Sequence, residues 1–266
     1  MVARKSIEQH RSAASDLSEL VAAELAAYFA ALDLSRPEAV RNALLEFMPL
    51  LVAEYGQTAQ ALAMEWYDQL RFESGPSTGF LVTAPLVASI TPERVQAKVR
   101  YLAGQLWTPD PGGILAGLTS AADKYVKQYG RDTIASNAER DGASWARVPT
   151  GEKTCAWCLI LASRDAVYIS EQTALTRADG DRYHGFCDCE AVPIWGPDDY
   201  PEGYLPDDYY DMYRVGDDKM RSDPEVRAFM DSLDEHDKNR QLKGIVFAMR
   251  REFPDAVNDG IFGHTH

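Results

Sequence analysis

The sequence predicts a mainly α-helical protein with a small α+β module in its second half and a short helical C-terminus. Apolar residues recur at steps of three and four over most of the first 142 of the 266 residues. After Gly142 this spacing gives way to short β-prone runs separated by turns. We expect a helical domain over residues 1–142, the α+β module over 143–197, and an acidic, tyrosine-rich segment with C-terminal helices over 198–266.

The composition is that of an ordinary globular protein, with 45% hydrophobic residues and a formal net charge of −14. This charge argues against a basic nucleic-acid-binding surface over the whole molecule, because neutralising phosphates takes clustered Lys and Arg. The first apolar stretch, from about Leu17 to Leu32, is interrupted by Glu19 and Glu24, so it resembles neither a signal peptide nor a membrane span. We expect a soluble protein made in the cytosol, with no membrane partner.

Three helical stretches are predicted in the first 72 residues. The apolar stripe over residues 17–32 predicts the first helix. The Ser-Arg-Pro-Glu run at 35–38 then provides an N-cap, a proline for the first turn and a capping box for a second helix. Pro49 lies inside the pattern of that helix, where we expect a kink or a break because proline removes a backbone donor. The spacing of Leu62, Trp66 and Leu70 predicts a further helix.

Turn residues over 73–89 predict a loop, and helical spacing resumes over 91–107. A Pro- and Gly-rich break at 109–113 precedes a long helix from Ile114 to about Arg140, with Gly142 as its stop. Three β-prone runs follow this helix, at Trp145 to Val148, Val167 to Ile169 and Ala191 to Trp195. Two further helices are predicted near the C-terminus, at about Asp223–Leu233 and Glu235–Glu252.

All four cysteines of the chain lie within 35 residues, together with one of its five histidines. Cys155 and Cys158 form a Cys-x-x-Cys pair, and His184 is followed by Cys187 and Cys189. Two such turns can hold one tetrahedral zinc ion at ligand distances of about 2.0–2.3 Å. In a reducing compartment this clustering indicates a metal before disulfides, which remain the alternative.

Five donors compete for four positions around such an ion. We favour Cys155, Cys158 and His184, with Cys187 ahead of Cys189 as the fourth ligand. A site closed by four protein ligands leaves no position for water, so the predicted zinc is structural rather than catalytic. It would supply folding free energy to a module that has few apolar residues of its own.

Catalytic motifs are missing from the sequence. It contains no His-x-Glu run of a zinc deaminase, no paired histidines of a metalloprotease, no phosphate-binding Gly-rich loop and no Gly-x-Ser-x-Gly elbow. Two enzymatic alternatives stay open, a nucleophile pair of Cys155 with His184 and a His-Asn-His-like nuclease braced by the cysteine pairs. The nuclease needs more than one histidine near the phosphate, and this region offers only His184. We therefore predict no enzymatic activity.

The segment from Pro197 to Asp218 carries eight acidic residues and one basic residue, with five tyrosines interleaved. One interpretation is a solvated loop. The other is a docking strip that is mobile in the free protein. Tyr209 and Tyr210 would be its anchors, and Asp207, Asp208 and Asp211 would steer the approach of a basic partner.

One family combines these features in the same order, with a helix that has an Arg-x-Thr core, then Cys-x-x-Cys, then His-x-x-Cys-x-Cys and a strand. The sequence resembles the Mu F-like minor head proteins of tailed bacteriophages, and most of all their divergent members in phages of actinobacteria. The resemblance spans about Arg131 to Pro193. The residues that carry it are Arg131, Thr133 and Asn137, then Cys155 and Cys158, then His184, Cys187 and Cys189.

The chain departs from the family pattern at three points. Ile134 follows the helix Thr where the family usually has Glu, Gly185 follows His184 where the family usually has Pro, and Asp188 replaces Arg between the last two cysteines. The zinc ligands survive these changes.

The resemblance implies a minor capsid protein for head morphogenesis, located inside the phage head near the portal. Its implied partners are the portal and the major capsid protein, with at most weak contact to packaged DNA. Arg131 has two interpretations, a helix residue held by a salt bridge and a candidate partner contact on the surface of the helix. Members of the family are often described as capsid maturation proteases, which adds a protease to the enzymatic alternatives.

Overall fold

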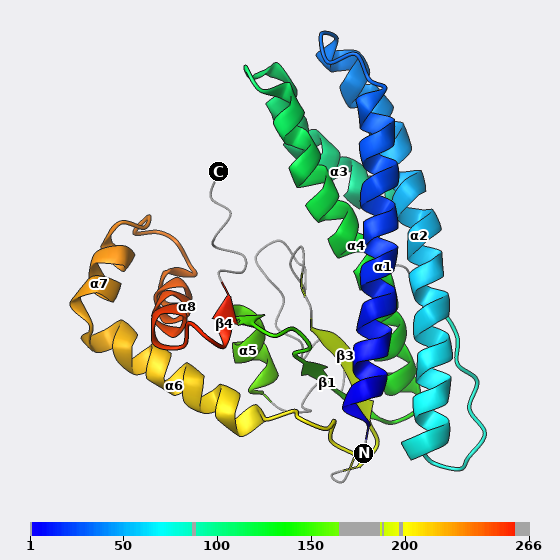
Figure 1. The fold of residues 1–266 in the computed structure, drawn as a ribbon, viewed down its shortest axis with the longest axis vertical. Coiled ribbons are helices and arrows are strands. Elements are labelled where there is room, and N and C mark those ends of the chain that lie inside the picture. Colours follow the sequence, from blue (N-terminus) through cyan, green and yellow to red (C-terminus); the bar gives the residue numbers. More distant parts are fainter. Residues whose placement is uncertain (1, 87–88, 165–186, 188, 197–198, 259–266) are drawn as a thin grey trace.

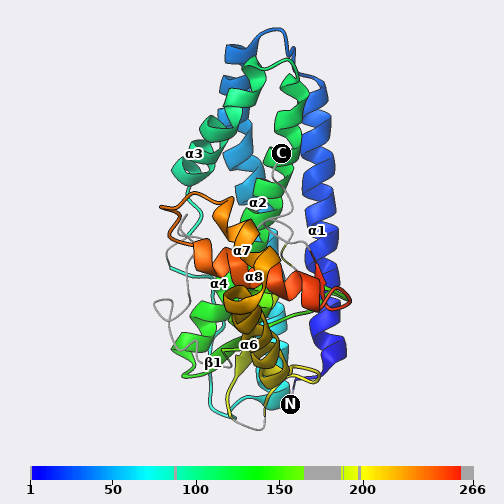
Figure 2. The same cartoon turned by 90° about the vertical axis from the view of Figure 1, so that its left-hand side faces the viewer.

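Three long helices run side by side and form the tall part of the molecule, which we call the arm (Figure 1). They are α1 (Arg4–Ala30), α2 (Pro37–Ser74) and α4 (Ile114–Arg140), and each contacts the other two. Figure 2 shows that α3 (Pro92–Leu102) lies beside them in the upper half of the arm. The computed structural model describes residues 2–86, 89–164, 187, 189–196 and 199–258.

The arm forms because the predicted apolar stripes pack against one another. Leu25 of α1, Leu44 of α2 and Leu118 of α4 are fully buried in one cluster. Helix α1 begins at Arg4, well before the predicted stripe, and its first turns bury Ile7 in a second cluster at the base of the arm. The four residues of α1 that fill the upper cluster are Leu17, Val21, Leu25 and Phe29.

Helix α2 is continuous through Pro49 as far as Ser74. The alternative of a break at Pro49 is therefore wrong, and the helix predicted over residues 62–70 is the end of α2 and not a separate element. Met48 and Leu51 on either side of the proline are buried, and their packing offsets the one backbone hydrogen bond that proline cannot donate. Pro37 occupies the first turn as predicted, whereas the N-cap is Arg36 and Ser35 donates its hydroxyl to Asp33 instead.

The chain between α2 and α4 follows the predicted order of loop, helix and break. Thr91 caps α3 by accepting a hydrogen bond from the Arg94 amide, and the predicted helix ends as a 3-10 turn over Ala103–Trp107. A second 3-10 turn, Pro111–Gly113, leads into α4. Helix α4 has the predicted bounds, and the chain turns after it at Gly142, whose φ of 70° suits glycine.

A two-stranded antiparallel sheet packs against the lower end of α4. It pairs β1 (Ser144–Val148) with β3 (Glu190–Ile194), in the register that sets Ala146 opposite Val192. Two of the three predicted β-prone runs therefore form this pair, and the third, residues 167–169, lies outside the described residues.

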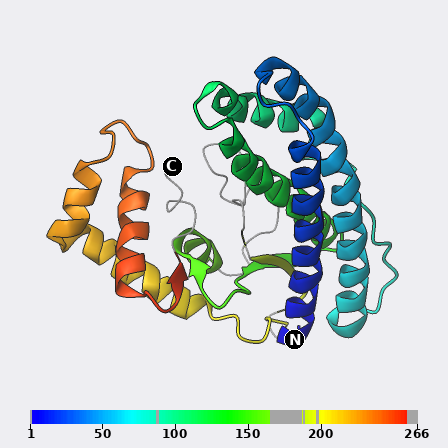
Figure 3. The same cartoon turned by 45° about the horizontal axis from the view of Figure 1, so that its top comes forward.

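Between the two strands in sequence, the chain forms a short helix that the sequence analysis missed. Helix α5 (Ala156–Ala162) follows β2 (Thr154–Cys155) directly, and β2 pairs in parallel with β4 (Val257–Asn258) near the C-terminus. Figure 3 shows α5 between the arm and the C-terminal helices.

The C-terminal part contains three helices, α6 (Pro206–Ser222), α7 (Pro224–Asp231) and α8 (Arg240–Glu252). The acidic tyrosine-rich segment was expected to be a loop or a mobile strip, and most of it is instead helix α6, which packs against α8. Asp207 and Asp208 lie in its first turn, and Lys219 and Arg221 lie in its last turn. Charges in this order stabilise a helix, because they are opposite to the partial charges of the helix dipole at each end.

Within the described residues, no helix has both the length and the apolar character needed to cross a membrane.

Candidate metal centre

The first cysteine pair is held by the junction of β2 and α5. Cys155 is the N-cap residue of α5, and its sulfur atom accepts a hydrogen bond from the Cys158 amide over 3.3 Å. The side chains of Cys155 and Cys158 are 2% and 0% exposed. This turn directs both sulfur atoms to the same place, which is what a Cys-x-x-Cys chelate requires.

The second pair immediately precedes β3, and Cys187 and Cys189 are both fully buried. The sulfur atoms of Cys158 and Cys187 lie 3.4 Å apart, and those of Cys158, Cys187 and Cys189 all lie within 4.8 Å of one another. In a tetrahedral zinc site with Zn–S bonds of about 2.3 Å, neighbouring sulfur atoms are about 3.8 Å apart. The observed spacing therefore suits one tetrahedral ion.

None of the four cysteines forms a disulfide bond in the structure, so the disulfide alternative does not describe it. The pKa of the Cys158 thiol is raised well above its ordinary value by hydrogen bonds to Cys155, Cys187 and Cys189 and by burial. These hydrogen bonds place Cys155 in the same cluster as the other three. Metal binding to such a cluster displaces protons, because a thiolate is the form that binds the ion.

The structure brings together four of the five predicted metal ligands. His184, the fifth, lies outside the described residues. The sequence-based preference for Cys187 over Cys189 has no counterpart in the geometry, since both sulfur atoms lie within 4.8 Å of that of Cys158. The group with all sulfur atoms within 4.8 Å of one another is Cys158, Cys187 and Cys189. Cys155 lies in the same buried cluster and is the candidate for a fourth sulfur ligand.

A buried arginine contacts this cluster from the arm. Arg131 of α4 is 3% exposed, and its Nη2 atom donates a hydrogen bond to the backbone carbonyl of Cys187 over 2.7 Å. Of the two interpretations of Arg131, the partner contact on the surface is wrong, because the side chain is buried inside the protein.

The other two helix residues of the motif also have interior roles. Asn137 is fully buried and binds the loop before α3, where it accepts a hydrogen bond from the Thr83 amide and donates one to the Thr83 carbonyl. The hydroxyl of Thr133 donates to the carbonyl of Tyr129, one turn earlier in α4. The three motif residues thus hold α4 to the cysteine segment, to the loop and to its own backbone.

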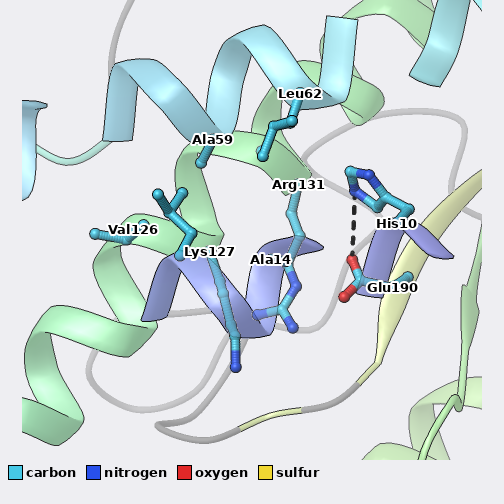
Figure 4. Close-up of a pocket in the computed structure, with 10 residues that line it drawn as sticks. His10, Ala14, Ala59, Leu62, Val126, Lys127, Arg131 and Glu190 are labelled. Carbon is cyan, nitrogen blue, oxygen red and sulfur yellow. Dashed lines mark ion pairs between the residues drawn. The ribbon is translucent and has the colours of Figure 1, made fainter. Parts of the chain in front are cut away.

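A small cavity of about 20 Å³ lies on the arm side of Arg131. Figure 4 shows His10 reaching it from α1, Lys127 and Arg131 from α4, and Glu190 from the start of β3. His10 stacks on the ring of Trp66 with their centroids 4.1 Å apart. Its Nε2 atom lies 4.0 Å from a carboxylate oxygen of Glu190, which is longer than a hydrogen bond.

The pKa of His10 is lowered to about 4, mainly by burial and to a lesser extent by the positive charge of Arg131. The imidazole ring is therefore neutral at neutral pH. Neither His10 nor Glu190 was among the site residues predicted from the sequence. A signal for His10 was present, since it lies seven residues before Leu17 and so continues the buried stripe of α1 toward the N-terminus. Glu190 carries no comparable signal beyond its place next to Cys189.

Of the two predicted anchors on α6, Tyr209 packs against the core and Tyr210 is exposed to solvent. Tyr209 is half-buried against the chain's own core, its ring centroid lies 6.0 Å from that of Tyr204, and burial raises its pKa. It therefore stabilises the fold and is not a free anchor. Tyr210 is 50% exposed, and Asp207 and Asp208 are exposed beside it.

The comparisons with known proteins agree with a phage origin. The sequence profile of one family, described as VG15 protein, matches residues 1–215, which is most of the chain. The chain is also similar to the Gene 15 proteins of Mycobacterium phage D29, at 29% identity, and of Mycobacterium phage L5, at 28%. Each match covers 34% of this chain and 44% of the relative, so the chain spans less than half the length of these relatives. No solved structure matches the chain.

Proposed function

The chain belongs to the VG15 family and is similar to phage Gene 15 proteins, and we propose from its resemblance to the Mu F-like proteins that it is a structural protein of a phage head with no enzymatic activity. The proposed location is the inside of the head near the portal, where it serves as a minor capsid protein during head morphogenesis. This location and the proposed partners, the portal and the major capsid protein, come from the resemblance to the Mu F-like proteins. The proposed metal is a structural zinc ion.

The main observation that supports a structural role is the burial of the cysteine cluster. All four cysteine side chains are between 0% and 2% exposed, so a substrate has no open path to their sulfur atoms. In the proposed site Cys155 joins Cys158, Cys187 and Cys189, and four sulfur ligands would leave no position for a catalytic water. Both features are typical of metal sites that hold a fold together.

The zinc would be held by Cys155 and Cys158 on one side and by Cys187 and Cys189 on the other. When bound, it would supply a crosslink between the start of α5 and the start of β3. The residues of the chain already bring these two segments together through buried sulfur contacts and through the hydrogen bond of Arg131 to Cys187. The ion therefore stabilises the module that joins the arm to the C-terminal helices.

The test is the location of the chain in purified particles of the phage or prophage that encodes it. We expect mass spectrometry to find it in heads separated from tails, at a lower copy number than the major capsid protein. Cryo-electron microscopy of these heads should show density for it on the inner side near the portal. Absence from particles that contain the portal would contradict the proposal.

The nuclease alternative predicts a different result with the purified protein. Cleavage of DNA that depends on a divalent ion and is lost in His184→Ala would favour a nuclease over a structural protein. The structural role instead predicts no cleavage by the wild-type chain.

We place the docking surface for a basic partner on the exposed side of α6. Asp207, Asp208 and Asp211 are exposed there next to Tyr210, and their charge complements a positively charged surface. Since Tyr209 packs inward, Tyr210 is the aromatic residue of this surface that a partner can cover.

The variant Asp207→Asn with Asp208→Asn tests this surface. It should reduce incorporation of the chain into particles and slow its association with the purified portal at low salt, because exposed charges act mainly on the association rate. Asp16→Asn with Glu19→Gln removes the same charge from the exposed side of α1 and serves as the control. Equal incorporation of both variants would contradict the assignment to α6.

A further inference from the structure

We propose that Arg131 is a positioning residue of the cysteine centre, which fixes the segment that carries Cys187 and Cys189 and stabilises the metal-bound cluster with its positive charge. This inference rests on the proposed metal site and goes beyond it, because it assigns part of the metal affinity to a residue of the arm that is not a ligand.

The first support is the contact itself. Arg131 donates from Nη2 to the carbonyl oxygen of Cys187 over 2.7 Å, and both residues are buried. Cys187 and Cys189 are two residues apart, so fixing the backbone of Cys187 limits where both sulfur atoms can lie. Outer residues of this kind orient the metal ligands in many metalloproteins.

The second support is the balance of charge. A zinc ion bound by four thiolates has a formal charge of −2, and a buried charge is costly unless an opposite charge lies near it. The guanidinium group of Arg131 is charged at every pH at which the protein is folded, and the side chain is 3% exposed. Its hydrogen bond to a ligand residue places this positive charge beside the cluster.

The third support is the way Arg131 is held. It belongs to the middle of α4, a helix that packs on both α1 and α2. On the arm side it lines the small cavity together with Glu190, the residue that follows Cys189. The guanidinium therefore lies between a rigid helix and the cysteine segment, and the arm is connected to the metal site through it.

The experiment measures metal affinity with the full-length chain. Co²⁺ is added to the reduced protein, the thiolate-to-cobalt absorption reports on sulfur coordination, and Zn²⁺ affinity is then measured by competition. Arg131→Met removes both the charge and the hydrogen bond, and we expect Zn²⁺ to bind about 10–100-fold more weakly, the usual effect of losing an outer partner of a ligand. Arg131→Lys keeps the charge without the planar group and should lose less affinity.

Two controls separate positioning from a general loss of stability or charge. Arg71→Met removes another arginine of the arm, whose ion pair with Asp141 measures 2.8 Å and is mostly buried, so it should destabilise the fold and leave metal affinity within about threefold of the wild type. Lys127→Met removes the other positive charge that lines the cavity but leaves the contact with Cys187 in place, and it should also stay within about threefold.

The inference is overturned if Arg131→Met binds Zn²⁺ as tightly as the wild type, or loses no more affinity than Arg71→Met. If Arg131→Met does not fold, Arg131→Lys decides, and wild-type affinity in that variant overturns the role of the guanidinium. A wild-type chain that binds neither Co²⁺ nor Zn²⁺ overturns the proposed metal site itself, and the inference with it. The failure of the two proposals is thus distinguishable.

Discussion

The aromatic ring of Tyr129 lies against the backbone of Gly56 where α4 packs on α2. A Cβ atom on Gly56 would lie 2.5 Å from Cδ2 of that ring, far inside van der Waals contact. The hydroxyl of Tyr129 also donates to the carbonyl of Ile90 over 3.2 Å, which restrains the ring. The two helices reach this separation because residue 56 has no side chain.

The substitution Gly56→Ala should therefore destabilise the arm. Overpacking a buried contact typically costs about 1–3 kcal/mol, while alanine gains about 1 kcal/mol over glycine in helix propensity. We expect a net loss of about 1 kcal/mol in the free energy of unfolding, measured by urea denaturation. Gly104→Ala is the control, since a Cβ atom at that position meets nothing within 4 Å. Equal stability of the two variants would show that α2 and α4 can separate without cost.

The metal prediction concerns the reduced protein purified without chelators. Elemental analysis should find about one zinc per chain, because the proposed site gathers the buried sulfur atoms of the four cysteines around one ion. Cys158→Ser should lose the zinc and the cooperative unfolding of the module around it. Ala162→Ser places a hydroxyl at another buried position of α5 and should keep the zinc. A wild-type chain without bound metal would contradict the prediction.

The buried His10 predicts a specific loss of stability in acid. Histidine in the unfolded chain has a pKa of about 6.5, and burial lowers the pKa of His10 to about 4 in the folded protein. Between these values the unfolded chain binds more protons, so stability falls as the pH falls from about 6.5 to about 4, by up to about 3 kcal/mol.

Urea unfolding of the wild type and of His10→Gln across this pH range isolates the contribution of His10. The difference in unfolding free energy between the two should shrink as the pH falls. His236→Gln is the control, since the side chain of His236 is 85% exposed. A difference that stayed constant between pH 6.5 and pH 4 would contradict the burial of a neutral imidazole.

The next prediction concerns the loop before α3, which is hydrogen-bonded to the side chain of Asn137. The variant Asn137→Ala loses its hydrogen bonds to both backbone groups of Thr83, and unsatisfied groups in a part-buried place cost about 1–3 kcal/mol each. We expect a loss of stability of about 2–4 kcal/mol and faster amide hydrogen exchange around Thr83. Asn42→Ala is the control, because Asn42 is exposed and its side-chain oxygen accepts hydrogen bonds from the neighbouring Arg41. Unchanged exchange at Thr83 would show that the loop is held by other contacts.

The sequence by itself determined the helices of the arm and the composition of the metal centre. The stripe of Leu17, Val21 and Leu25 and the bounds of α4 follow from spacing along the chain, because a helix repeats its buried face every three to four residues. The two cysteine pairs were likewise visible from their spacing, since each chelating turn is local.

Features that depend on contacts between distant parts of the chain became visible only in the tertiary structure. Helix α6 was hidden by its acidic residues, although Tyr209, Met212 and Met220 have helical spacing, and it is stabilised by packing on α8. Arg131 looks like a surface residue in sequence and is buried because the cysteine segment folds over it. His10 and Glu190 meet at one cavity although most of the chain separates them. Such contacts are set by how whole helices pack, and no local spacing encodes them.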